Sequence, residues 1–354
     1  MAAAGKFEWK IAIVNKPLKD KTYFENLKET VIDTGICSRC LTCACICPVD
    51  GIIAAKPVDF PDYKERCTDC GACVRVCPRF DYKPKYGMGE YLEFVAAKSN
   101  RFVGQDGAMV TEIMMSAIEM GMIDRALFVG RNDEWMTEVF HVYDPSQLEM
   151  GTLTGTKYTF ATVLKDLKKA VLLSKKGVGI VGTPCIVSGV KKLQKEYPLF
   201  RERVKLVVGL FCTENFHYEE LAAFLSEKGV DHNRLIKTDI TKGKFIATME
   251  GEEEPVTFKV KELEEILPSG CSVCTDFTAV EADVSVGSVG SKPGFSSVAV
   301  REKNAAEVMD YIREKGYAEF GGDAVEKQLE FLINYKIGRF YVETAEEEGR
   351  DKSL

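Results

Sequence analysis

Strand-like and helix-like segments alternate along the chain from about residue 88 to residue 302. Short apolar runs rich in valine, isoleucine and phenylalanine have the composition of buried strands, and longer segments between them are typical of helices. The predicted strands are 91–99, 125–130, 138–144, 178–185, 204–212, 282–290 and 295–302, and the predicted helices lie within 104–121, 160–177, 186–196 and 216–229. This order predicts a large α/β domain.

Composition places the chain among globular proteins that can bury a core. Its 354 residues are 45% hydrophobic and 29% charged, and the length predicts two or three domains. The net charge of −7 argues against nucleic acid as a partner. No apolar run approaches the roughly 18 residues of a membrane span, and charges interrupt the N-terminus too often for a signal peptide. We therefore expect a cytoplasmic protein, associated with a membrane only through a partner.

The segment in front of the α/β domain is dense in cysteine. Nine of the thirteen cysteines lie between 37 and 77, where the pattern C-x2-C-x2-C-x3-C-P occurs twice with a period of 30 residues. This is the bacterial ferredoxin run, in which three thiolates of one run and the last thiolate of the other hold one 4Fe–4S cube. We predict one cube on Cys37, Cys40, Cys43 and Cys77, and another on Cys67, Cys70, Cys73 and Cys47.

Two structural zinc sites are the alternative, because zinc also uses paired C-x2-C. Three closely spaced thiolates followed by C-P, and repeated, favour iron–sulfur cubes. Cys45 lies within the first run but outside its spacing. A free cysteine behaves as a small apolar side chain, so we expect Cys45 to pack beside the cluster; a redox or ligand role is the alternative.

The remaining four cysteines lie in the α/β region. Cys185 and Cys212 each follow an apolar strand, at the edge where open α/β sheets bind ligands. Cys271 and Cys274 form C-x2-C. The spacing alone leaves three interpretations of this set: a third 4Fe–4S cluster, a zinc site, or unrelated buried thiols.

Four glycine-rich stretches in the same region would let the backbone approach a phosphate. None matches G-x-G-x-x-G after a strand or the phosphate-binding pattern G-x-x-x-x-G-K-[ST], so each taken singly is most simply a turn. The stretches are "GQDGA" at 104–108, "TGTKYT" at 154–159, "GTPC" at 182–185 and "VGSVGSKPG" at 286–294. Together, beside cysteines at strand ends, they indicate a dinucleotide near iron–sulfur chemistry.

The α/β region resembles the coenzyme F420 hydrogenase/dehydrogenase beta-subunit family. The resemblance rests on "GQDGAMVTEI", "TGTKYT", "GTPCIVSGVKKL", "VGLFCTENF", "CSVCTDFTAVEADVSVGSVGS" and "GFSSVAVR", which follow the family's order over most of residues 98–301. It implies a flavoprotein that binds FAD and a 4Fe–4S cluster and exchanges hydride with the deazaflavin coenzyme F420. Ile186 departs from the glutamine of many members.

The resemblance also implies roles for particular residues. Cys185, Cys212, Cys271 and Cys274 match the family's cluster ligands. Positions that match its cofactor-proximal residues are Gly104, Gly107, Gly155, Thr156, Lys157, Tyr158, Glu214, Asn215, Gly287, Ser288 and Gly290. We name no catalytic side chain, because transfer of a hydride to a flavin needs no general base.

These expectations together describe an electron-transfer subunit. The predicted divisions are an N-terminal extension (1–28), a two-cluster ferredoxin module (29–85), a flavin and 4Fe–4S domain (86–320), and a C-terminal helix with an acidic tail (321–354). The arrangement resembles the electron-input subunit of F420H2 dehydrogenases, formate dehydrogenase beta subunits, and the flavin part of F420-dependent sulfite reductase.

The expected function follows from this arrangement. Electrons would pass from coenzyme F420 through FAD and three clusters to other subunits of a redox complex. We expect this complex to serve archaeal energy metabolism such as methanogenesis. Its type would be a dehydrogenase, a hydrogenase, a formate dehydrogenase or a heterodisulfide reductase. Use of NAD(P)H or ferredoxin as the donor, or a pure iron–sulfur linker without a working flavin, are the alternatives.

Overall fold

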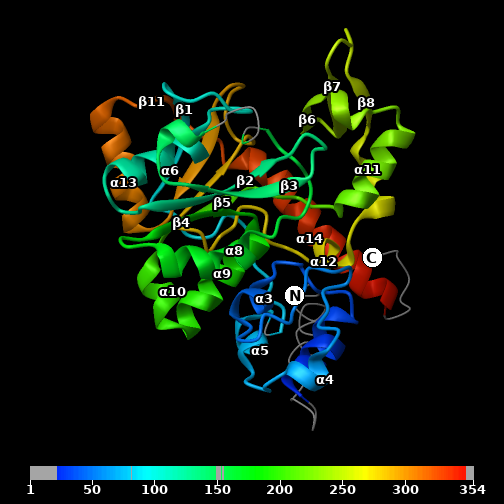
Figure 1. Ribbon diagram of the computed structural model, residues 1–354. Helices are drawn as coiled ribbons and strands as arrows, with labels where there is room; N and C mark the ends of the chain where they lie inside the picture. The colour runs from blue at the N-terminus through cyan, green and yellow to red at the C-terminus, as the bar shows by residue number, and fades with distance from the viewer. Residues whose placement is uncertain (1–21, 81, 149–152, 154, 348–354) are drawn as a thin grey trace.

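The structure is a computed structural model that describes residues 22–80, 82–148, 153 and 155–347. It has a mixed α/β fold built on a large sheet, with the cysteine-dense segment packed beneath it (Figure 1). The predicted extension at 1–28 lies mostly outside the described residues, as does the end of the acidic tail.

An eight-stranded sheet in the order β11-β1-β10-β9-β5-β4-β2-β3 forms the centre of the described chain. Its strands are β1 (Glu93–Ser99), β2 (Arg125–Arg131), β3 (Thr137–Val142), β4 (Val178–Gly182), β5 (Val204–Leu210), β9 (Val284–Gly287), β10 (Ser296–Val300) and β11 (Ala318–Asp323). The four central strands β2, β4, β5 and β9 are parallel to their neighbours in that group, and the outer pairs are antiparallel. The carboxyl ends of the central strands therefore meet at one edge.

Alternate residues of the central strands face two different helix layers. Leu206 and Val208 of β5 belong to the same apolar cluster as helices α6 and α13, whereas Val207 belongs to the cluster of α8 and α9. Successive side chains of a strand point to opposite faces, so the sheet is covered on both sides. The helices are α6 (Met109–Glu119), α8 (Val163–Leu173), α9 (Pro184–Glu196), α10 (Pro198–Arg203) and α13 (Lys303–Lys315).

A second, three-stranded sheet was not predicted from the sequence. It consists of β6 (Leu235–Thr241), β7 (Lys244–Met249) and β8 (Val256–Lys259), and it packs with α11 (Tyr218–Glu227) around its own apolar cluster (Figure 1). Lys242 and Gly243 join β6 to β7 with positive φ angles of 50° and 72°, as a tight hairpin turn requires. The described connections also contain 3₁₀ helices at Pro145–Gln147, His232–Arg234 and Val260–Ile266.

The cysteine-dense segment forms a small module of short helices. They are α2 (Tyr23–Leu27), a π-helix (Lys28–Ile32), α3 (Thr42–Ile46), α4 (Tyr63–Arg66) and α5 (Ala72–Val76). Phe24 and Leu27 pack in the core of this module with Phe60. Residues 22–28 are therefore structurally part of it.

The module shares a core with the large domain. Cys45 and Val76 belong to the same apolar cluster as Leu164 of α8 and Val187 of α9. The last described helix, α14 (Lys327–Glu347), passes behind the sheet in the view of Figure 1, contacts α12 (Ser269–Ser272) and packs Ile337 against the core of the small module. Among the described residues, no helix combines the length and the apolar character that crossing a membrane would need.

Candidate iron–sulfur centres

Each predicted ferredoxin-type ligand set lines a cavity of its own. One cavity is lined by Leu27, Leu41, Val58 and Arg79 among others, together with Cys37, Cys40, Cys43 and Cys77. The other is lined by Tyr23, Phe60 and Gly71 among others, together with Cys47, Cys67, Cys70 and Cys73. The fold thus brings the last cysteine of each run to the first three of the other run, which is the crossed partition predicted from the spacing.

The backbone around the two cavities repeats the same unusual conformation. Arg39 and Leu41 have φ angles of 52° and 61°, and Asp69 and Gly71, thirty positions later, have 50° and 70°. Three of these four residues carry a Cβ that disfavours positive φ. Alternation of right- and left-handed residues turns successive amide N–H groups inward and forms a concavity for an anionic group, as at many iron–sulfur sites. This backbone fits a 4Fe–4S cube in each cavity.

Burial makes several of these thiols poor thiolates unless a positive charge accompanies them. Burial raises the pKa of Cys37 to about 11, of Cys73 to about 12 and of Cys77 to about 12. A metal cluster supplies the positive charge that holds such ligands deprotonated. Cys70 differs because its side chain is exposed, so the second cavity is the one that approaches the surface.

Cys45 lines neither cavity. Its side chain is 1% exposed and lies in the core that the small module shares with α8 and α9. Burial raises the pKa of its thiol to about 12, so it is neutral at pH 7. The structure therefore supports a packing role for this thiol.

The third cysteine set gathers at the carboxyl edge of the large sheet. Cys185 and Cys212 follow the neighbouring parallel strands β4 and β5, which places them side by side. The Cys271 thiol donates to the carbonyl of Asn215 (Sγ–O 3.5 Å), and the Cys212 thiol donates to the carbonyl of Glu214 (3.6 Å). Cys185, Cys212, Cys271 and Cys274 all lie within electrostatic range of one another. Cys185 is also within range of Cys40, so this set adjoins the first ferredoxin cavity.

Two buried cations flank this set, and the sequence patterns identified neither. Lys336 of α14 donates to the Cys274 sulfur at 3.4 Å, and Arg79 lies within electrostatic range of Cys185 and Cys274. Burial alone would raise the pKa of the Cys274 thiol, but the neighbouring charges of Lys336 and Arg79 lower it below its usual value. For Cys185 burial outweighs the other influences and raises the pKa of the thiol to about 12.

Within the described part of the chain, no three His, Cys, Asp or Glu side chains are placed to hold a metal ion together.

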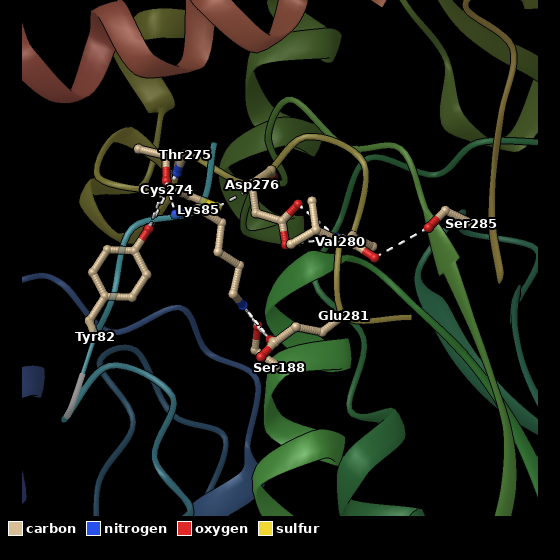
Figure 2. A network of polar contacts seen from close by, with 10 residues as sticks. Tyr82, Lys85, Ser188, Cys274, Thr275, Asp276, Val280, Glu281 and Ser285 are labelled. Carbon is tan, nitrogen blue, oxygen red and sulfur yellow. Dashed lines mark hydrogen bonds and ion pairs between the residues drawn. The ribbon is translucent and has the colours of Figure 1, made fainter. Parts of the chain in front are cut away.

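A polar network joins the small module to the loop that carries Cys274. The Tyr82 hydroxyl lies 3.3 Å from the Thr275 hydroxyl, and the Lys85 amide donates to the same Thr275 oxygen at 2.9 Å (Figure 2). The Lys85 ammonium donates to Ser188 and pairs with Glu281. Because these contacts span both parts of the chain, the small module is held in a defined position against the third set.

The predicted cofactor loop at 154–159 lies beside the third set; Thr154 itself is outside the described residues. Phe216 donates its amide to the carbonyl of Tyr158 at 2.8 Å, which ties this loop to the chain after Cys212. Gln105 accepts from the Thr156 amide at 2.8 Å and so brings the 104–108 loop to the same place. The Lys157 ammonium donates to the carbonyls of Val129 and Leu153, and burial, followed by Arg131, lowers its pKa to about 8.

Packing accounts for several of the predicted cofactor glycines. A Cβ on Gly107 would lie 2.3 Å from the Ala97 carbonyl oxygen, and one on Gly287 would lie 2.1 Å from the Phe211 ring. Gly290 has a φ of 101° and would meet Leu329. A Cβ on Gly104 would lie 3.0 Å from Ala108, and Gly155 has a positive φ of 80°, which favours glycine. The neighbouring Ser288 carbonyl accepts a hydrogen bond from the Ser291 hydroxyl within a turn. Close packing and turn geometry are thus sufficient reasons for glycine at these positions.

Comparisons with known proteins agree with this layout. Residues 29–78 match a 4Fe-4S dicluster domain. Residues 94–168 and 175–324 match the N-terminal and C-terminal parts of the coenzyme F420 hydrogenase/dehydrogenase beta subunit. The chain belongs to this family. The predicted resemblance is confirmed, and the chain is an iron–sulfur electron-transfer subunit of an oxidoreductase family.

Three relatives illustrate the range of the family. A coenzyme F420-dependent sulfite reductase of Methanocaldococcus jannaschii is 33% identical over 88% of this chain, which spans 50% of that protein's length. An F(420)H(2) dehydrogenase subunit from Methanosarcina mazei is 29% identical over 80% of this chain and 84% of its own. A chain of the F420-reducing [NiFe] hydrogenase complex from Methanosarcina barkeri is 29% identical with a TM-score of 0.68, over 75% of this chain and 95% of its own.

Proposed function

We propose that this chain exchanges hydride between coenzyme F420 and bound FAD and passes single electrons through three 4Fe–4S clusters to a partner subunit. Bound FAD would supply the step between two-electron and one-electron transfer, which a 4Fe–4S cluster cannot perform alone. Twelve cysteines would hold the clusters: Cys37, Cys40, Cys43, Cys47, Cys67, Cys70, Cys73, Cys77, Cys185, Cys212, Cys271 and Cys274.

The observation that carries the proposal is the succession of the three cysteine sets. The third set lies at the sheet edge, beside the loop of Lys157 and Tyr158. Its Cys185 is within electrostatic range of Cys40 in the first ferredoxin set. The second ferredoxin set ends at the exposed Cys70. This order supports a path from a buried cofactor to a partner at the surface.

The residues near the third set are suited to bind an anionic dinucleotide. Lys157 is a half-buried cation whose described partners are two carbonyl oxygens, and Arg131 lies within electrostatic range of it. Two cations at a sheet edge favour the negative charge of a pyrophosphate. We therefore assign FAD to this edge of the sheet. On one side of the FAD we place the loop of Gly155, Thr156, Lys157 and Tyr158, and on the other we place the end of β9 with Gly287, Ser288 and Gly290.

Anaerobic purification of the full chain, followed by rapid mixing with reduced coenzyme F420, tests the proposal. We expect about 12 iron atoms per chain, by the arithmetic of three cubes, and acid-releasable FAD. Flavin absorbance should bleach on mixing, and cluster absorbance should decrease after it.

The alternatives give different results. Bleaching with NADH but not with the reduced deazaflavin would show that the donor is a nicotinamide. A preparation with full iron and no releasable flavin would indicate a pure electron-transfer linker. Eight iron atoms with stoichiometric zinc would contradict the third cluster.

A further inference from the structure

Lys336 is a buried charge that the electron path does not account for. Its side chain is 1% exposed, and it lies on α14, far along the chain from the cysteines it contacts. The ammonium donates to the Asp276 carbonyl at 2.7 Å, to the Cys212 carbonyl at 2.9 Å and to the Cys274 sulfur at 3.4 Å. All three donor positions of the ammonium are thus directed at the third cysteine set and its loop.

A buried ammonium is costly unless an anion compensates it. An unpaired buried charge is strongly disfavoured because it loses its hydration without gaining a counter-charge. Two of the three contacts of Lys336 are neutral carbonyls, and the third is the Cys274 sulfur. The groups within electrostatic range that can carry negative charge are Asp276 and, as thiolate ligands of the proposed cluster, Cys274 and Cys212. The compensating charge therefore belongs largely to the ligand set.

A second cation approaches the same set from the small module. Arg79 is 3% exposed and donates to the Gly270 carbonyl at 3.2 Å, next to Cys271. Its Nη1 atom is buried without a hydrogen-bond partner in the described residues. Lys336 contacts the set from α14, while Arg79 follows the Cys77-Pro78 end of the second ferredoxin run. The third set is thus flanked by positive charge from two separate elements.

We propose that Lys336 raises the reduction potential of the cluster held by Cys185, Cys212, Cys271 and Cys274, acting as a positioning residue through its charge and its hydrogen bond to the Cys274 sulfur. Adding an electron makes a cluster more negative, and a nearby cation stabilises that state. Net charge and hydrogen bonds to sulfur are established determinants of cluster potential. The inference rests on the proposed third cluster and adds to it the residue that sets its potential.

The test is a redox titration of the full chain, followed by electron paramagnetic resonance, on matched variants. K336Q removes the charge but keeps an amide donor, and K336R keeps the charge. K327Q removes one charge from an exposed position on the same helix and serves as the control. We expect K336Q to lower one of the three midpoint potentials by at least about 59 mV. For a one-electron couple, this shift corresponds to a tenfold fall in the ratio of reduced to oxidised cluster at a fixed potential. K336R and K327Q should match the unaltered protein.

Iron content, measured first, separates this inference from the proposed function. Twelve irons with unchanged potentials in K336Q would overturn the role of Lys336 and leave the three-cluster proposal intact. A shift in K336R as large as that in K336Q would also overturn it, because the charge is then not the cause. If K336Q alone loses four irons while K336R keeps its iron and its midpoint potentials, the result would support the need for a positive charge at this position. If both variants lose four irons, the result would overturn the role proposed for the charge of Lys336. Eight irons in the unaltered protein would overturn both proposals.

Discussion

Replacing Cys45 separates a ligand from a packing residue within one run of five cysteines. The structure places its sulfur in the core shared by α3, α5, α8 and α9 and outside both cysteine-lined cavities. Cys45→Ala removes one buried heavy atom, which is comparable to a CH2 group worth about 0.8 kcal/mol. With a small cavity term, the free energy of unfolding should fall by about 1–1.5 kcal/mol.

Cys45→Ser keeps the size of the side chain but places a hydroxyl in the apolar cluster that also contains Leu164 and Val187. The Lys168 backbone is the polar group beside this position, and burying a hydroxyl that is incompletely hydrogen-bonded costs about 1–3 kcal/mol. We therefore expect the apparent unfolding temperature to fall in the order unaltered protein, Cys45→Ala, Cys45→Ser. Both variants should retain about 12 irons, because the ligands of all three proposed cubes are intact.

The assay is anaerobic iron analysis combined with thermal unfolding. Cys43→Ala is the matched control, since it removes a thiol two positions earlier that lines the first ferredoxin cavity. It should lose about four irons. Loss of four irons from Cys45→Ala, or full iron in Cys43→Ala, would refute the assignment of ligand and surplus thiol.

Two further predictions concern the third set and the contact between the modules. Cys185→Ser should still allow reduced coenzyme F420 to bleach the flavin but should slow reduction of the ferredoxin-type clusters in stopped-flow and electron paramagnetic resonance measurements; unchanged cluster reduction would contradict the proposed path. Burial, and secondarily the charge of Arg39, lowers the pKa of His217 to about 4 in the folded protein. Between about pH 6.5 and pH 4 the unfolded chain therefore binds a proton at this histidine that the folded chain does not bind. The stability of the folded protein should consequently fall as the pH falls through this window. His217→Gln should flatten that part of a plot of unfolding temperature against pH, and an unchanged slope would count against it.

The sequence by itself determined the features that depend on local spacing. The 30-residue period of the cysteine runs predicts the crossed ligand partition, and the structure brings each predicted set to the lining of one cavity. The alternation of apolar strands and helices likewise located the strands of the main sheet from β1 to β10, because a strand or helix repeats its side-chain directions over a few residues. The strands β6 to β8 escaped detection because charged residues interrupt them and they cover one small core.

Only the tertiary structure decided the surroundings of these features. Lys336 is separated by 62 residues from Cys274 and by 124 from Cys212, so no local pattern marks it as a neighbour. Gly107 and Gly287 look like phosphate-binding glycines in the sequence, yet packing against Ala97 and Phe211 already excludes a Cβ at each. Thiolate spacing is a property of a short segment, whereas charge and close packing around a cluster depend on which distant segments the fold brings together.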